Sequence, residues 1–271
     1  MIPIGTAQEN NVSNAFSRQA AEFDEMDRLN PVIQRMRNQV HTHLLSLLKP
    51  GDRILELNAG TGIDAIFLAQ HGFEILATDN AGGMLAAGAE KIKALGLEKK
   101  IQLQKCSFNN LEDLKAGTFD HIFSNFGGLN CSENIENVIK QFDRLLNSGG
   151  KATLVIMPPV CPWEMLLALK GNFKIAFRRW NKKGIRSHLE GAYFNTYYYS
   201  PKRLYNAFDK NKYSKIAVKG LGILSPPPYL EKFPVQHPKI FNALCRMEEK
   251  IDLRSPFNSW ADHFIISMKK N

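Results

Sequence analysis

Short runs rich in β-branched residues alternate with stretches of helical periodicity along residues 53–157. This alternation is typical of βαβ units, whose parallel strands form a sheet that helices cover on both faces. Two further strand-like runs lie near residues 215–218 and 263–268. We therefore predict an α/β fold with a Rossmann-like, doubly wound, mostly parallel sheet of seven strands. In chain order the first five predicted strands are 53–57, 74–78, 101–105, 121–124 and 151–157, with helices near 63–70, 83–95 and 135–146 between them.

Two segments of different character flank the predicted sheet strands. Residues 13–48 are helical in period, and Asn30-Pro31 is a helix-start signal that divides them into two helices. Residues 160–199 break the βα rhythm, because an aromatic and basic helical stretch precedes a run whose alternation and central Gly191 predict a pair of strands. The domains we predict are an N-terminal helical lid (1–50), a Rossmann-like core (51–159 and 200–271) and an inserted cap (160–199).

The composition is that of an ordinary globular protein, with 44% hydrophobic and 23% charged residues. Residues 1–14 are polar, and no apolar run is long enough to span a bilayer, so we expect no signal peptide and a cytoplasmic protein. The four cysteines are far apart and form no CxxC pair, which predicts reduced thiols and no metal site. They are Cys106, Cys131, Cys161 and Cys245.

The net charge of +9 is divided unevenly along the chain. Residues 1–159 hold 15 Lys and Arg against 18 Asp and Glu, a net −3, whereas residues 160–271 hold 20 against 8, a net +12. A basic half of this kind occurs in proteins that bind an anionic substrate, nucleic acid or a membrane surface, and also as a merely solubilising face. Charge by itself therefore leaves these alternatives open.

A glycine turn follows the first predicted strand. Residues 60–65, Gly-Thr-Gly-Ile-Asp-Ala, fit the G-x-G-x-x-[G/A] pattern, and Asp79 lies 19 residues beyond Gly60, so a dinucleotide-binding unit is one interpretation. A carboxylate at the mouth of the turn argues against it, because Glu56 would repel a pyrophosphate held by helix amides. S-adenosylmethionine instead offers a cationic ammonium and a sulfonium, which favour a nearby carboxylate. Glu56 therefore favours the second ligand.

The segment 55–62, Leu-Glu-Leu-Asn-Ala-Gly-Thr-Gly, resembles the first motif of class I S-adenosylmethionine-dependent methyltransferases, [DE]-x-G-x-G-x-G. Gly60 and Gly62 match the last two glycines of that motif, while Asn58 replaces the first. Asparagine is the non-glycine residue that most readily accepts left-handed backbone angles, so we expect Asn58 to preserve the turn. Ala59 lies in the same turn.

Later segments resemble this family in the same order along the chain. The resemblance implies that Asp79 accepts hydrogen bonds from the ribose hydroxyls and that Asn80 and Met84 flank the adenine. Where the family often places an acidic residue near the adenine amino group, this sequence has Cys106 followed by Ser107 and Phe108. The remaining residues that the resemblance places at the cofactor are Asn125, Phe126 and Gly127 after the fourth strand, and Phe16 and Phe23 on the lid helix, for which core packing is an equal alternative.

The cofactor implied is S-adenosyl-L-methionine, with S-adenosyl-L-homocysteine as product. Methyl transfer is an in-line displacement, so a base is needed only if the acceptor must lose a proton. We predict His188 and Tyr193 as catalytic candidates, although each is more often structural, whereas His121 in mid-strand reads as a core histidine. The predicted substrate contacts are Asn130, Cys131, Trp163 and Glu190.

The acceptor class follows from two further segments. Nucleic-acid amino-methyltransferases of this fold carry [DNS]-P-P-[YFW] after the fourth strand, and Ser-Asn-Phe-Gly-Gly at 124–128 does not match it, which disfavours nucleic acid. The insertion places Phe173, Phe177 and Trp180 at i, i+4 and i+7 among cations, which predicts one helical stripe that packs on the sheet, covers an aromatic or acyl substrate, or docks on an anionic membrane. We expect a small-molecule enzyme similar to the quinone- and biotin-pathway methyltransferases; the alternatives are an RNA methyltransferase and a non-catalytic regulator that binds the cofactor.

Overall fold

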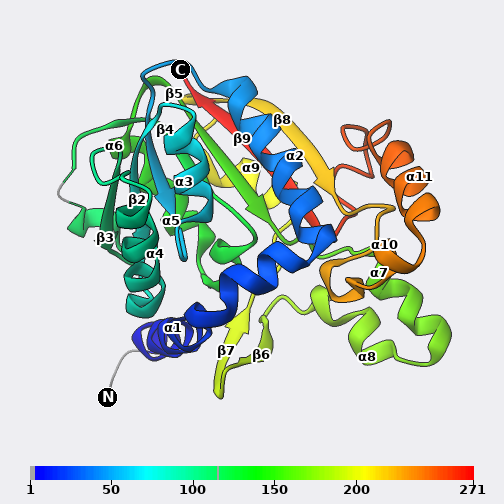
Figure 1. The fold of residues 1–271 in the computed structure, drawn as a ribbon. Coiled ribbons are helices and arrows are strands. Elements are labelled where there is room, and N and C mark those ends of the chain that lie inside the picture. Colours follow the sequence, from blue (N-terminus) through cyan, green and yellow to red (C-terminus); the bar gives the residue numbers. More distant parts are fainter. Residues whose placement is uncertain (1–3, 115) are drawn as a thin grey trace.

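A seven-stranded mixed sheet forms the centre of the computed structural model, which describes residues 4–114 and 116–271. The strand order is β3-β2-β1-β4-β5-β9-β8, and all neighbouring pairs are parallel except those made by β9. The predicted fold class is confirmed, and the antiparallel β9 inserts between β5 and β8 (Figure 1). The strands are β1 Arg53–Leu57, β2 Glu74–Asp79, β3 Ile101–Lys105, β4 Phe119–Ser124, β5 Leu146–Ile156, β8 Tyr213–Leu221 and β9 His263–Lys270.

Helices cover both faces of this sheet, and their ends follow local sequence signals. α2 begins where predicted, because Pro31 occupies its first turn and the Asn30 side chain accepts hydrogen bonds from the amides of Val32 and Ile33. No helix among the described residues is long and apolar enough to cross a membrane. The longer helices are α1 Ile4–Leu29, α2 Pro31–Leu47, α3 Ile63–Gln70, α4 Gly82–Ala94, α5 Ile135–Lys140, α9 Pro201–Ala207 and α11 Pro238–Glu248.

Alternate residues of the central strands enter two separate hydrophobic clusters. Leu55 and Ile122 pack toward α5, the four-residue α6 (Phe142–Leu145) and α9 on one face of the sheet, whereas Ile54 and Phe123 pack toward α2, α3 and α11 on the other. His121 is 1% exposed, and burial lowers its pKa to about 3, as expected for a core histidine. Because both faces are covered, the open edge at the carboxyl ends of the parallel strands is where a ligand can enter.

The inserted segment differs from the prediction of one helix. It contains α7 (Pro162–Met165), η3 (Leu166–Lys170), α8 (Phe173–Ala176) and η4 (Arg178–Trp180), because Gly171 takes a left-handed φ of 76° and interrupts the helical hydrogen bonding. The predicted stripe of Phe173, Phe177 and Trp180 on a single helix is therefore wrong.

The predicted strand pair that follows is confirmed as the hairpin β6 (Ile185–Leu189) and β7 (Ala192–Thr196). Its two-residue turn consists of Glu190 and Gly191, both with positive φ, as a tight hairpin requires. β7 lies beside α1 (Figure 1). The remaining short elements are η1 Leu111–Asp113, η2 Gly128–Cys131, η5 Pro228–Leu230 and α10 Phe233–Gln236.

Candidate functional site

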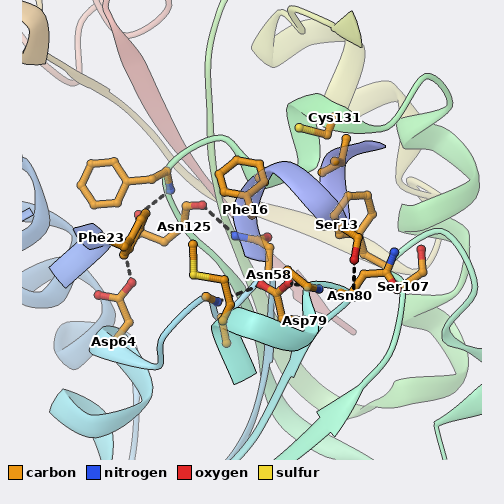
Figure 2. A pocket seen from close by; sticks show the side chains of 18 of the residues that line it. Ser13, Phe16, Phe23, Asn58, Asp64, Asp79, Asn80, Ser107, Asn125 and Cys131 are labelled. Carbon is orange, nitrogen blue, oxygen red and sulfur yellow. Dashed lines mark hydrogen bonds between the residues drawn. The ribbon is translucent and has the colours of Figure 1, made fainter. Parts of the chain in front are cut away.

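A cavity lies at the carboxyl ends of β1, β2 and β4, beneath the lid helix α1 (Figure 2). It brings together twelve of the fifteen residues predicted to bind the cofactor, although they come from widely separated parts of the sequence. These twelve are Phe16, Phe23, Asn58, Ala59, Gly60, Asp79, Asn80, Met84, Ser107, Phe108, Asn125 and Phe126. Cys131, predicted as a substrate contact, also lines the cavity, whereas Glu56, Gly62 and Gly127 do not.

Asp79 at the end of β2 braces the glycine turn after β1. One carboxylate oxygen accepts the Gly60 amide at 2.9 Å and the other accepts the Ala81 amide at 2.7 Å. Burial raises the pKa of Asp79, and these backbone hydrogen bonds oppose that rise. Because a carboxylate oxygen can accept more than one hydrogen bond, Asp79 can hold the turn and still receive ribose hydroxyls.

Asn58 preserves the turn and also links it to the loop after β4. Its φ of 48° is left-handed, as expected from the sequence. The side-chain oxygen accepts the Ser124 hydroxyl at 2.5 Å, and the side-chain amide donates to the carbonyl oxygen of Asn125 at 3.0 Å. A Cβ atom on Gly128 would lie 2.3 Å from the Asn58 Cγ, so this glycine is required for the close approach.

The Glu56 carboxyl is buried beneath the turn instead of facing the cavity mouth, with 2% of the residue exposed. Burial, reinforced by the charges of Asp64 and Asp79, raises its pKa well above the usual value despite the opposing influence of Arg37. Its Oε2 atom has no hydrogen-bond partner among the described residues. A buried carboxyl without a partner destabilises the fold unless a ligand supplies one, so this atom fits the cationic methionine end of S-adenosylmethionine.

A buried ion cluster between α2 and α3, absent from the sequence predictions, forms one side of the cavity. Arg37 donates to Asp64 at 2.6 Å and to Asp27 at 2.5 Å, and Asp64 also contacts His41 at 2.6 Å. Burial alone would raise the pKa of Asp64, but Arg37 and His41 outweigh it and hold that pKa below its ordinary range. The guanidinium lies 4.7 Å from the Phe126 ring centroid, so a cation stands at the cavity wall.

The only signal for this cluster in the sequence was Asp64 in the first turn of a helix, a position that often serves the helix dipole. No local pattern connects it to Arg37, which lies 27 residues earlier. The pairing therefore became visible only when α2 was packed against α3.

Helix α1 lines the cavity and is held there by close contacts with the residues that follow β2. Gly83 at the start of α4 donates to the Ser17 hydroxyl at 3.1 Å. Ser13 donates to the Asn80 carbonyl at 2.8 Å, as Figure 2 shows. A Cβ atom on Gly83 would lie 2.5 Å from the Ser17 carbonyl oxygen, so only glycine permits this distance. Glu9 extends the contact to the loop after β3, where it accepts a hydrogen bond from Ser107 at 3.1 Å.

The arrangement has known counterparts. Residues 54–150 match the family model described as a methyltransferase domain. The demethylmenaquinone methyltransferase of Thermus thermophilus is 30% identical over 165 residues, which cover 60% of this chain and 70% of that protein. The chain belongs to the class I S-adenosylmethionine-dependent methyltransferase family. The cofactor of this family is S-adenosylmethionine, as the residues of the turn predicted.

Other methyltransferases define how far the similarity extends. A demethylmenaquinone methyltransferase of Bacillus cytotoxicus is 32% identical over 152 residues. The aligned region covers 54% of this chain and 61% of that protein. The fold matches geranyl diphosphate C-methyltransferase from Streptomyces coelicolor A3(2), solved with Mg²⁺, geranyl diphosphate and S-adenosyl-L-homocysteine. That match has a TM-score of 0.59 and 11% sequence identity, and covers 88% of this chain and 81% of that one.

The residues predicted for methyltransferase catalysis lie elsewhere. His188 and Tyr193 sit on the exposed hairpin, with ring centroids 4.5 Å apart, and neither lines the cavity. The reason is that α1 intervenes: Phe16 on α1 lines the cavity, while Asn11 on the same helix donates to the Tyr193 carbonyl on the outer side. In this arrangement the two side chains do not reach the cavity.

Three predicted substrate residues have structural surroundings instead. Asn130 is fully buried, and its side-chain amide donates to the Met157 and Tyr197 carbonyls, so it joins the strand-end loops. The Trp163 indole donates to the Leu224 carbonyl at 3.2 Å, and Glu190 occupies the hairpin turn. None of these three lines the cavity.

Proposed function

We propose that the protein transfers the methyl group of S-adenosylmethionine to a small aromatic or lipid-like acceptor. Two curated relatives at 30% and 32% identity act on demethylmenaquinone according to their names, which supports a quinone-like acceptor. The composition of the cavity also supports this class, because Phe16, Phe23 and Phe126 supply aromatic surface.

The observation that carries the cofactor placement is the unpartnered Glu56 carboxyl below the turn. Met84 would flank the adenine of the cofactor, Asp79 would accept hydrogen bonds from its ribose, and Glu56 and Asn125 would lie at its methionine end. Glu56, just below the cavity floor, would attract the ammonium of the cofactor, and Arg37 at the cavity wall would hold its carboxylate. The cofactor would supply the methyl group of its sulfonium to an acceptor in the cavity, beside the loop after β4 that carries Phe126.

The protein contributes to the reaction mainly by positioning. An in-line displacement needs the acceptor atom behind the methyl carbon on the axis of the breaking bond, and a closed lid keeps water from that axis. The contacts of α1 with Asn80 and Gly83 hold such a lid in place. The acceptor therefore approaches from the side of the cavity that Phe126 borders.

Methyl-deuterated S-adenosylmethionine tests the proposal. The protein is incubated with this cofactor and either a reduced demethylnaphthoquinol that carries a short isoprenoid chain, or total RNA, and each product is analysed by mass spectrometry. We expect the label in the quinol. Label in the RNA would instead establish the nucleic-acid alternative, and cofactor binding without label in either product would favour the non-catalytic regulator.

We also propose that the inserted segment contacts an anionic membrane and so meets an acceptor dissolved in lipid. Residues 165–189 contain seven Lys and Arg and no Asp or Glu. Within this segment Leu169 is 84% exposed, Phe173 63% and Trp180 54%. Exposed apolar side chains among cations are typical of proteins that insert into the headgroup layer of anionic bilayers.

Vesicle co-sedimentation separates membrane contact from mere exposure. We expect binding to phosphatidylglycerol-containing vesicles, weaker binding to pure phosphatidylcholine vesicles, and loss of binding in the triple variant Leu169→Ser, Phe173→Ser and Trp180→Ser. The control variant removes apolar side chains that are similarly exposed outside the segment: Leu95→Ser, Met247→Ser and Leu253→Ser. Equal binding by both variants would contradict the proposed docking segment.

A further inference from the structure

We propose that His263 is the general base that accepts a proton from the acceptor, and that Asp262 and Arg179 position it. This inference rests on the proposed methyl transfer to an aromatic acceptor. An aromatic hydroxyl becomes a much stronger nucleophile when it loses its proton, so a base beside the cavity adds to what positioning alone provides.

His263 lies at the same edge of the sheet as the cofactor cavity. It is the first residue of β9, and its neighbour Phe264 pairs with Ile156 at the carboxyl end of β5. Ligands of open α/β sheets bind at this edge. His263 does not itself line the described cavity, but its ring meets the ring of Phe126, which does, nearly edge-on with centroids 5.8 Å apart. An acceptor bound beside Phe126 would therefore lie next to His263.

The Asp262 carboxylate fixes which nitrogen of His263 is free. The Nδ1 atom of His263 lies 2.9 Å from an Asp262 oxygen. Although burial alone would raise the pKa of Asp262, His263 and Arg179 lower it, so the carboxylate is ionised and Nδ1–H is the donor. The Nε2 atom is then the nitrogen that Asp262 leaves free, and it forms no hydrogen bond to the described residues.

The inserted segment holds this pair through the buried Arg179 side chain. Its guanidinium donates to the other Asp262 oxygen at 2.7 Å, to the Asp262 carbonyl at 2.8 Å and to Glu164 at 2.8 Å. Cys161, Glu164 and Asp262 also lie close enough together to suggest a cation site. Arg179 already occupies both carboxylates, so the protein itself supplies the positive charge there.

Other histidines near the site do not offer a free nitrogen in the same way. The Nε2 atom of His41 lies 2.6 Å from Asp64, and its ring stacks on Phe67. His188 is on the far side of α1, as described above. Among the histidines around the described cavity, His263 therefore combines a fixed tautomer with a free nitrogen.

The reaction step balances without a further reactant. The O–H bond of the acceptor hydroxyl breaks as its proton passes to Nε2 of His263. The electron pair left on the oxygen makes that oxygen, or a ring carbon conjugated with it, more nucleophilic. The new bond to the methyl carbon forms while the methyl–sulfur bond breaks, which leaves neutral S-adenosyl-L-homocysteine. After attack by carbon, the ring proton leaves to solvent and aromaticity is restored, and His263 returns its own proton to solvent.

The test compares His263→Asn with His263→Ala and the parental protein on the reduced demethylnaphthoquinol. Asparagine keeps a donor toward Asp262 but cannot act as a base. We expect kcat to fall by about 10²- to 10⁴-fold in both variants, with the dissociation constant of S-adenosyl-L-homocysteine and the melting temperature close to parental in His263→Asn. Added imidazole should restore part of the activity of His263→Ala, and His188→Ala should match the parental rate.

Each outcome bears on a different claim. A parental kcat in His263→Asn would overturn the role of His263 and leave the proposed function standing. A loss of kcat that is fully explained by lower stability or weaker cofactor binding would have the same consequence. Absence of methylation by the parental protein, with cofactor binding intact, would overturn the proposed acceptor class and this inference together.

Discussion

The side-chain amide of Asn58 donates a hydrogen bond of 3.0 Å to the carbonyl oxygen of Asn125, which joins the turn after β1 to the loop after β4. Both segments line the cavity at the carboxyl ends of the strands. The residue that departs from the family's glycine motif therefore supplies a contact that glycine could not make. The departure couples the cofactor turn to the loop that ends at Gly128.

Gly128→Ala tests that coupling. Its new Cβ would lie 2.3 Å from Asn58 Cγ, and overpacking of this kind destabilises a protein by about 1–3 kcal/mol. The double variant with Asn58→Gly should recover part of this loss, since the clash disappears while two side-chain hydrogen bonds are also lost. Denaturant unfolding measures both, with Gly82→Ala as control because nothing lies within 4 Å of its added Cβ. Additive effects of the two changes would contradict the coupling.

Gly83→Ala should loosen the lid while the sheet stays intact. The added Cβ meets the Ser17 carbonyl oxygen at 2.5 Å, so α1 must move away from α4. We expect cofactor affinity to fall about tenfold or more, equivalent to at least about 1.4 kcal/mol, and trypsin to cleave α1 faster. Calorimetric titration and limited proteolysis measure this, again with Gly82→Ala as the control. Unchanged affinity despite faster cleavage would mean that the lid does not contribute to cofactor binding.

Binding of S-adenosylmethionine should release a proton from Glu56. In the free protein burial raises the pKa of this carboxyl, and a cationic ammonium beside it would lower that pKa. Between the two pKa values, affinity therefore rises with pH, and it levels off above the free-state value. Calorimetry in two buffers of different ionisation enthalpy detects the proton. Glu56→Gln should abolish the buffer dependence. Asp79→Asn is the control, because the pKa of Asp79 is also raised and Asp79 is therefore the other possible source of the proton. Identical heats in both buffers for the parental protein would refute the prediction.

Asp64 should make the fold sensitive to acid. Its folded-state pKa is lower than the unfolded value of about 3.9, so its stabilising contribution is present above that value and is lost as pH falls through the folded-state pKa. Asp64→Asn leaves Arg37 with one buried carboxylate partner, Asp27, instead of two, and should cost about 1.5–3 kcal/mol at pH 7. The difference from the parental protein should shrink below about pH 4. The control Glu25→Gln, at an exposed ion pair, should change stability little at either pH. If the difference in unfolding free energy between Asp64→Asn and the parental protein stayed constant with pH, this account would be wrong.

The sequence by itself determined the features that depend on short-range order. The βαβ alternation, the start of α2 at Asn30-Pro31 and the left-handed backbone at Asn58 and Gly60 each follow from the conformational preferences of a few adjacent residues. The same reasoning located Asp79 near the glycine turn, because the carboxyl ends of parallel strands meet at one edge of a sheet. This was enough to identify the cofactor and the family.

Only the tertiary structure decided how charges and segments far apart in the sequence meet. Arg37 pairs with Asp64 because α2 packs on α3, and Glu56 is buried because those helices cover the turn. His188 is separated from the cavity because α1 passes between them, whereas His263 contacts Phe126 at the cavity wall because β9 inserts antiparallel beside β5. Such contacts depend on packing between elements, and a periodic pattern within one element carries no information about which other element will face it.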